Sequence, residues 1–316
     1  MSAAAFAMVQ LGDLIGRQLE PLLLDETVEW ERELDWDFSR SAELVRHFTD
    51  TKSLAGAALL DRGEVVGYGY AVIEEHKALV GDVYMRPGWR TQDAEVRLFG
   101  TILDALTGMP GLRRIESQLM LLDPAVGEAL RRTRPITISE RMLMSIPEPP
   151  MWRAAKAPGR FRIEGWSEHH QELAATVIAL AYAHHVDSRI NEQYLSVAGA
   201  RRFLSNIVQY PGCGTFFRQG SMVAFDARGG WVAGMVLASM VAPRTGHITQ
   251  LCVTPQAQGT GLGRELLQRS MDALYRHGAQ RVSLTVTAAN RPAVELYRST
   301  GFREMRRFLS YTWDGK

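Results

Sequence analysis

Apolar and polar residues follow two periodicities in the second half of the chain. Short runs in which they alternate predict β-strands, and longer stretches with an apolar residue every three or four positions predict α-helices. The expected strands are 161–166, 221–227, 231–241, 246–255 and 281–287, with a closing strand pair within 302–313. The expected helices are 169–183, 198–208, one that ends near residue 277, and 292–300. This alternation predicts an α/β fold with a mixed sheet.

The first half shows the same order of elements. Strands are expected at 54–61, 63–75, 77–87 and 113–119, with a helix that ends within 104–108. When the halves are aligned at a constant offset of 168, which is 255 minus 87, Pro87 meets Pro255 and Asp104 meets Asp272. At the same offset, Pro124-Ala125-Val126 meets Pro292-Ala293-Val294. Shared triplets at one offset, with matching periodicity, indicate a duplication.

The segment between the two halves lacks either periodicity. Residues 147–160, PEPPMWRAAKAPGR, are rich in proline, which interrupts helices and strands, and are therefore interpreted as a linker. The length of 316 residues also suits two domains of ordinary size. The expected organisation is one domain in 1–146, the linker in 147–160 and a second domain in 161–316.

Composition narrows the functional classes. The net charge is +1, from 36 Lys+Arg and 35 Asp+Glu, so no nucleic-acid partner is expected. No apolar run approaches the roughly 18–20 residues of a membrane span, so no membrane partner is expected either. Cys213 and Cys252 provide neither a disulfide framework nor a zinc motif. The first residues lack the basic segment of a signal peptide. A cytoplasmic protein without a metal site is expected.

A glycine-rich stretch precedes the helix that ends near residue 277. It reads QAQGTGLGR over 256–264, with Gly259, Gly261 and Gly263 at every second position. Glycines let the backbone approach an anion closely, and a helix N-terminus presents free N–H groups and partial positive charge. This pattern favours a phosphate or pyrophosphate site. It lacks the glycine spacing of the dinucleotide fingerprint and the Gly-Lys-Ser/Thr of the phosphate loop. A tight turn without a ligand is the alternative.

Together with a second motif, this stretch resembles the GNAT superfamily of N-acetyltransferases. Residues 258–263, QGTGLG, resemble its Gln/Arg-x-x-Gly-x-Gly/Ala motif, directly after a strand that ends in Val253-Thr254-Pro255. Residues 290–302, NRPAVELYRSTGF, resemble its Asn-x-x-Ala-x-x-Leu-Tyr-x-x-x-Gly-Phe segment. The resemblance covers 161–316 strongly and 50–146 weakly. It implies two tandem GNAT-like domains, in a layout similar to that of mycothiol synthase, each a mostly antiparallel sheet flanked by helices.

The resemblance also implies acetyl-CoA as donor and a primary amine of a small molecule or peptide as acceptor, attacked directly. A non-catalytic acyl-CoA sensor or interaction module is the alternative, because the family's strand carboxylate is missing from HITQLCV (247–253). The donor would be held by the backbone of the glycine stretch, by the strand that polarises the thioester, and by a helix-capping asparagine. These expected donor-binding residues are Gln258, Gly259, Thr260, Gly261, Leu262, Gly263, Arg264, Leu251, Cys252, Val253 and Asn290.

Two residues are candidates for proton transfer. Tyr297 lies where the family places a general acid for the leaving thiolate, although a core tyrosine on an amphipathic helix is the alternative. The general base is unassigned, and His185 is its candidate because histidine titrates near neutral pH and this region borders the acceptor in the family. An exposed or structural histidine is the alternative. Cys252 is expected to be a small buried residue rather than a nucleophile.

The first half departs from the donor-binding pattern. At the offset of 168, Gly259, Gly261 and Gly263 correspond to Thr91, Asp93 and Glu95, Asn290 to Leu122, and Tyr297 to Ala129. Carboxylates in place of glycines would repel a pyrophosphate, so no donor is expected there. This copy is expected to wall the acceptor cleft or to carry a homodimer surface. Residues 25–37, DETVEWERELDWD, are expected to be a solvated helix face with two packed tryptophans, or a docking face for a cationic acceptor.

Overall fold

The computed structural model describes residues 6–147, 159–210 and 212–315. The chain divides into two compact units. The first contains the residues up to Arg141 together with those from Arg307 onward, and the second runs from Met142 to Arg306. The expected linker, 147–160, lies outside the described residues except at positions 147, 159 and 160. No helix in the described part of the chain combines the length and apolarity that crossing a membrane would need.

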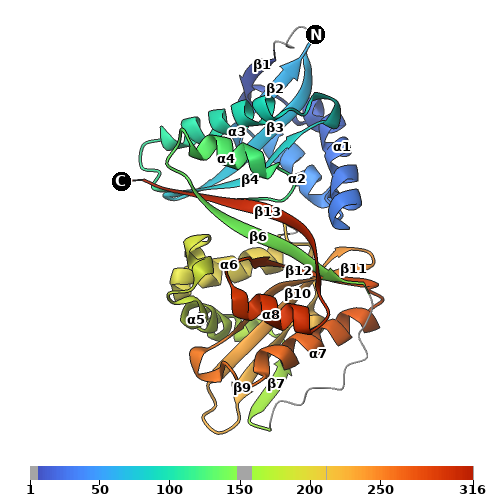
Figure 1. Ribbon diagram of the computed structural model, residues 1–316, viewed down its shortest axis with the longest axis vertical. Helices are drawn as coiled ribbons and strands as arrows, with labels where there is room; N and C mark the ends of the chain where they lie inside the picture. Colours follow the sequence, from blue (N-terminus) through green and yellow to red (C-terminus); the bar gives the residue numbers. More distant parts are fainter. Residues whose placement is uncertain (1–5, 148–158, 211, 316) are drawn as a thin grey trace. The chain divides into compact units, whose positions relative to one another are not determined.

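The first unit has a sheet in the order β1-β2-β3-β4-β5-β13. Helices α1 and α3 both contact β3, and the elements can be followed from blue to green in Figure 1. Its strands are β1 (Ala7–Gln10), β2 (Ala55–Asp61), β3 (Glu64–Glu74), β4 (Lys77–Met85) and β5 (Arg114–Leu119). Its helices are α1 (Gly16–Leu34), α2 (Ser39–Asp50), α3 (Gln92–Thr107) and α4 (Pro124–Arg131), with short 3-10 turns η1 (Leu11–Asp13) and η2 (Pro87–Trp89).

The second unit repeats this architecture. The order β12-β11-β10-β9-β7 forms its sheet, and β8 pairs with β10. Its strands are β7 (Phe161–Gly165), β8 (Thr215–Phe216), β9 (Met222–Asp226), β10 (Val232–Ala242), β11 (Thr245–Val253) and β12 (Arg281–Thr287). Its helices are α5 (Gln171–Tyr182), α6 (Val197–Gln209), α7 (Leu262–Arg276) and α8 (Arg291–Ser299). The second unit also contains the 3-10 turns η3 (Glu168–His170), η4 (Val186–Arg189), η5 (Glu192–Leu195), η6 (Arg218–Gly220) and η7 (Pro255–Ala257), of which η7 precedes α7.

Two strands continue from one unit into the other. Strand β6 (Thr137–Ile146) begins in the first unit and its last residues pack in the core of the second. Strand β13 (Arg303–Asp314) begins in the second unit, and its residues Leu309–Asp314 pair antiparallel with β5. In Figure 1 the red end of the chain accordingly lies beside the first unit's elements. The sequence assigns all of 161–316 to the second domain, whereas residues from Arg307 onward complete the first unit's sheet.

The expected strand pair within 302–313 is wrong. Residues 303–314 form one continuous strand, because they contain no Gly, Pro or Asn that would supply a turn. The other expected elements of the second half are present, with bounds that differ by one or two residues. The duplication is visible in the structure, because the turns Pro87–Trp89 and Pro255–Ala257 follow β4 and β11 at the offset of 168.

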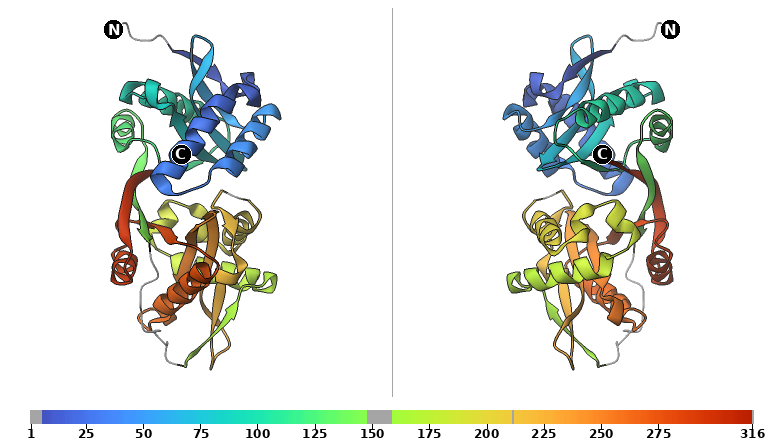
Figure 2. Two further views of the ribbon diagram at one scale, coloured as in Figure 1. Left: turned by 90° about the vertical axis from the view of Figure 1, so that its right-hand side faces the viewer. Right: turned by 90° about the vertical axis from the view of Figure 1, so that its left-hand side faces the viewer.

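Helices cover both faces of the second unit's sheet, as Figure 2 lets the reader follow. Side chains of β10 alternate between the two cores, as expected for a strand. Val236 and Ala238 pack in the core that contains residues of α7 and α8, whereas Met235 and Leu237 pack with residues of α5 and α6. Strand β11, whose end forms one wall of the site described below, contributes Ile248 to the first of these cores and Cys252 to the second.

Candidate active site

Strands β11 and β12 separate part of the way along their length. They pair in parallel from Thr245 opposite Arg281 to Ile248 opposite Leu284, where the ladder between them ends. On the other edge of β11, the register with β10 shifts between Leu237 and Ala238, which leaves Thr249 as an extra residue. Such a bulge bends a strand away from its neighbour. The edge of β11 from Thr249 to Val253 therefore faces an opening rather than β12.

Helix α7 begins at the end of this opening. Its N-cap is Gly261, with φ +86°, and no side chain caps the helix. The first N–H groups of a helix have no partners within it, so those of this turn are available to a ligand. Gly259 also has positive φ, +72°, and a Cβ at either glycine would meet no atom within 4 Å. The glycines thus hold a left-handed turn in open space, which suits the close approach of an anion.

One cavity of about 550 Å³ joins these features, and every residue that lines it belongs to the second unit. It contains all the residues expected from the sequence except Thr260, whose hydroxyl donates instead to the carbonyl of Ala257 at 2.6 Å. The expected residues that line it are Leu251, Cys252, Val253, Gln258, Gly259, Gly261, Leu262, Gly263, Arg264, Asn290, Tyr297 and His185. Residues separated by more than a hundred positions therefore converge on one hollow.

Helix α8 brings two of these side chains to the cavity. Asn290 caps the helix, because its Oδ1 accepts a hydrogen bond from the N–H of Ala293 at 3.4 Å. Gly301, with φ +102°, ends the helix in the left-handed conformation. Between them Tyr297 is 8% exposed, and its ring meets that of Phe302 edge-on at 5.9 Å. Tyr297 therefore both packs in the core and lines the cavity.

The opposite wall comes from the end of α5. Tyr182 and His185 line the cavity, and their rings meet edge-on with centroids 5.0 Å apart. The Tyr182 ring also stacks on Tyr194 at 4.4 Å, and its hydroxyl accepts a hydrogen bond from Nε2 of Gln250 at 2.8 Å. Burial raises the pKa of Tyr182 well above its usual value. Sequence reasoning missed Tyr182, because α5 ends at this residue and helical periodicity does not relate it to His185.

Cys252 is buried in the wall between β11 and the α5–α6 face. Burial raises the pKa of its thiol to about 12, so the thiol is protonated at neutral pH. His247 is also buried, and its Nδ1 lies 2.8 Å from Oγ of Ser283. His247 is not among the described residues that line the cavity.

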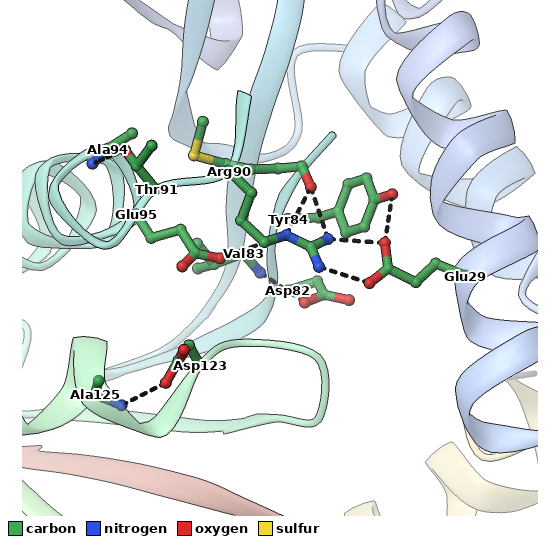
Figure 3. A network of polar contacts seen from close by, with 11 residues as sticks. Glu29, Asp82, Val83, Tyr84, Arg90, Thr91, Ala94, Glu95, Asp123 and Ala125 are labelled. Carbon is green, nitrogen blue, oxygen red and sulfur yellow. Dashed lines mark hydrogen bonds and ion pairs between the residues drawn. The ribbon is translucent and has the colours of Figure 1, made fainter. Parts of the chain in front are cut away.

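In the first unit a side chain of the protein crosses the equivalent position. Arg90 corresponds to Gln258, and its guanidinium donates to the carbonyl of Met85 from Nε at 3.2 Å and from one terminal nitrogen at 2.8 Å (Figure 3). It also forms two hydrogen bonds to Glu29, at 2.7 and 2.8 Å, and Tyr84 donates to the same carboxylate at 2.9 Å. Although burial opposes it, the Arg90 guanidinium holds the pKa of Glu29 below its usual value.

The start of α3 differs from the start of α7 in the same way. Thr91 caps α3 by accepting a hydrogen bond from the N–H of Ala94 at 3.3 Å, so one of its free N–H groups is already used. Glu95 is 4% exposed in the first turn, and burial raises the pKa of its carboxyl to about 7 while Arg90, 3.8 Å away, opposes the shift. Figure 3 shows Glu95 in the first turn of α3 and Asp123 directly before α4. The carboxyl group of Glu95 therefore stands at the position that Gly263 has in the second unit.

The expectation of a solvated face at 25–37 is wrong for two of its acids. Glu26 and Glu29 are buried, where Tyr68 and Tyr84 donate hydrogen bonds to them at 2.8 and 2.9 Å. At Glu29 the Tyr84 hydroxyl and Arg90 replace the water that a carboxylate would otherwise bind. Burial instead raises the pKa of Glu26 well above its usual value. Helix amphipathicity alone could not reveal this, because the partners lie on β3 and β4.

Comparison with known proteins assigns the domain that contains this cavity. The family model described as "Acetyltransferase (GNAT) family" matches residues 187–302. Residues 187–302 belong to the GNAT acetyltransferase family. The matched stretch contains β11, the α7 turn and α8, which are the elements that build the cavity. The second unit, which contains this match, is called the GNAT domain below.

Two relatives extend this picture. The chain is 28% identical over 260 residues to a mycothiol acetyltransferase from Thermobispora bispora, a stretch that covers 77% of this chain and 78% of that protein. It is 36% identical over 74 residues to an N-alpha-acetyltransferase from Sulfurisphaera tokodaii. That stretch covers 23% of this chain and 44% of the archaeal protein. The first relationship is longer than either unit and so includes residues of both, whereas the second covers less than half of the relative's length.

A solved structure shares the whole fold. A tandem GNAT protein from the clavulanic acid biosynthesis pathway superposes with a TM-score of 0.67 at 14% identity, over 98% of each chain. This similarity concerns the fold alone. It agrees with the duplication, because a tandem protein shares the fold of both units.

Proposed function

We propose that the GNAT domain transfers the acetyl group of acetyl-CoA to a primary amine of a small molecule or peptide by direct attack. One observation carries the proposal: a single cavity joins the uncapped start of α7, the open edge of β11 and the side chain of Tyr297. These are an anion cradle, a row of backbone hydrogen-bonding groups and a phenol. An acyl-CoA offers a diphosphate, an amide-containing arm and a thioester that match them in this order.

The residues present suit the donor. The amides from Gly259 to Arg264 would bind the diphosphate, because two of these positions have positive φ and open space above them. The backbone of Leu251–Val253 would pair with the amides of the coenzyme arm and polarise the thioester carbonyl, where negative charge develops. Asn290 lies at the same cavity while it caps α8.

Tyr297 is proposed as the general acid for the departing sulfur. A free thiol has a pKa of about 8.5, so a thiolate is a tolerable leaving group and protonation helps only moderately. The phenol lines the cavity from a largely buried position, where its orientation is held by packing against Phe302. A low-exposure site also keeps water away from the proton transfer.

The acceptor is proposed to be an amine of low basicity. Among the described residues that line the cavity there is no Asp or Glu, so no carboxylate is at hand to take a proton from an ammonium group. At pH 7.4 an α-amino group, with a pKa of about 7.8, is about 30% neutral, whereas an alkylamine with a pKa of about 10.4 is about 0.1% neutral. An α-amino group also agrees with the name of the archaeal relative, an N-alpha-acetyltransferase.

The test is acetyl transfer to a panel of amines, with released thiol as the signal. The full chain is incubated with acetyl-CoA and with alaninamide, short peptides, an amino sugar and hexylamine. Turnover with the α-amines and the amino sugar, well above that with hexylamine at neutral pH, is the expected result. Binding of acetyl-CoA by calorimetry without turnover on any amine would refute the enzyme and favour a non-catalytic acyl-CoA sensor.

A further inference from the structure

His185 is held in one orientation by its own loop. The loop leaves α5 through His184, which adopts a left-handed conformation with φ +63°, and then turns so that His185 precedes η4. Nδ1 of His185 accepts a hydrogen bond from the backbone N–H of Asp187 at 3.1 Å. The ring is packed against Tyr182, and its side chain is 29% exposed at the cavity.

This hydrogen bond determines which ring nitrogen carries the proton. A neutral imidazole has one N–H and one lone pair, and the lone pair of His185 must lie on Nδ1 because that atom accepts from Asp187. Nε2 then carries the hydrogen. A neutral His185 in this orientation can donate a hydrogen bond from Nε2 but cannot accept a proton there. The geometry therefore opposes its use as the general base for the acceptor amine.

A second contact fixes this loop to the sheet. The Thr287 hydroxyl, at the last residue of β12, donates to the carboxylate of Asp187. The same carboxylate lies 3.6 Å from Nδ1 of His185. Three residues later, Asn290 begins the cavity-lining part of α8. Asp187 therefore joins the loop of His185 to the strand end that leads to the donor side of the cavity.

From these contacts we infer that His185 selects the acceptor by donating a hydrogen bond from Nε2 to an oxygen close to the attacking amine, with Asp187 as its positioning residue. This inference rests on the proposed function and specifies its acceptor. The oxygen that fits is the carbonyl of an α-aminoacyl group, because it lies three bonds from the attacking nitrogen and accepts a hydrogen bond without carrying charge. The acceptor class is then an α-amino amide, such as a peptide N-terminus or an aminoacyl conjugate.

The test compares two small amines of similar basicity, glycinamide and propargylamine. The alkyne lowers the basicity of the amine as a carbonyl does but offers no oxygen to His185. The wild-type chain is expected to favour glycinamide in kcat/KM by about five- to tenfold, the range of one neutral hydrogen bond. His185→Leu should bring the ratio close to one, and His185→Gln, which places an N–H near the position of Nε2, should restore it. His184→Asn, at an exposed neighbour outside the cavity, should leave it unchanged.

The pH profile separates a donor from a base. If His185 donates, the acid limb of kcat/KM follows the amine and keeps its position in His185→Gln. A general base would instead be lost in that variant, with a large fall in kcat for both amines and a changed acid limb, and this result would overturn the inference. A glycinamide preference that His185→Leu leaves intact would overturn it as well.

Asp187 is tested through the same ratio. Asp187→Asn keeps an oxygen for the Thr287 hydroxyl and should preserve the preference, whereas Asp187→Leu should reduce it with the KM for acetyl-CoA little changed. If Asp187→Leu lowers kcat/KM for glycinamide and propargylamine equally, so that their ratio is unchanged, the role of Asp187 is merely structural. That result would refute its positioning of His185. Absence of thiol release from every amine, despite CoA binding, would instead refute the proposed function itself.

Discussion

The uncapped start of α7 predicts how a charge placed there will act on donor binding. Gly261 has φ +86° and open space around a built Cβ, and Asn and Asp are the residues that best tolerate this conformation after glycine. The side chains introduced by Gly261→Asn and Gly261→Asp therefore have the same shape and cause similar backbone strain, of about 1 kcal/mol. The two variants differ in one negative charge. If the cavity binds the diphosphate of CoA there, only the aspartate places a carboxylate beside it.

The expected difference can be worked from the charge. Two unit charges about 5 Å apart, at an effective dielectric of about 20, repel by about 3 kcal/mol, which is roughly a hundredfold in Kd. The comparison is internally controlled, because an acidic residue at a helix N-terminus stabilises the helix by about 0.3–1 kcal/mol. Gly261→Asp should thus melt no lower than Gly261→Asn while it binds CoA far more weakly.

The assay is isothermal titration of the full-length variants with CoA at low and at high salt. The gap between the two variants should narrow as salt rises, since the repulsion is screened. Equal dissociation constants for Gly261→Asn and Gly261→Asp at low salt would refute the placement of the diphosphate at this turn. A lower melting temperature for the aspartate variant would mean that folding, rather than the binding site, had changed.

Three further predictions follow from the site and from the first unit. Tyr297→Phe should lower kcat by about ten- to a thousandfold with CoA affinity little changed, as measured by thiol release and calorimetry, and an unchanged kcat would remove its role as acid. Calorimetry of the wild-type chain should give one CoA per chain, because Arg90 and Glu95 occupy the first unit's equivalent positions; a stoichiometry of two would contradict this. Burial raises the pKa of Glu95 from 4.5 to about 7, so its contribution to stability is full below pH 4.5 and is lost as pH rises to about 7. Glu95→Gln should therefore be more stable than the wild type by about 1–2 kcal/mol at pH 8 in urea unfolding, and the gain should vanish near pH 4.5, whereas a pH-independent difference would refute the assignment.

The periodicity and the glycine motif were sufficient for much of the second unit. They predicted the strand before Pro255, the turn at Gly259 and Gly261, and the helix cap at Asn290, because each depends on local backbone chemistry that short sequence patterns report. The two strands that continue between the units could not be predicted in this way. A strand's partner is determined by long-range pairing, and residues 303–314 alternate equally well whichever sheet receives them.

The side-chain network of the first unit was also beyond the sequence. The motif comparison showed that Thr91, Asp93 and Glu95 replace glycines, but it gave no sign that Arg90 reaches the carbonyl of Met85. The same guanidinium binds Glu29, which lies more than fifty residues earlier on α1 and was expected to face water. Buried ion pairs between distant elements leave no periodic trace in either element.

The exchange of strands β6 and β13 affects how this protein can be made and dissected. The sheet of the first unit lacks β13 until the residues from Arg307 onward have been synthesised, so it can be completed only after the entire GNAT domain has been translated. A gene fragment that starts after residue 160 would produce a GNAT domain without Met142, Met144 and Ile146 in its core and with Leu309–Asp314 deprived of their partner strand. Removing the residues after Arg306 would, conversely, damage the half of the protein that contains no expected catalytic group.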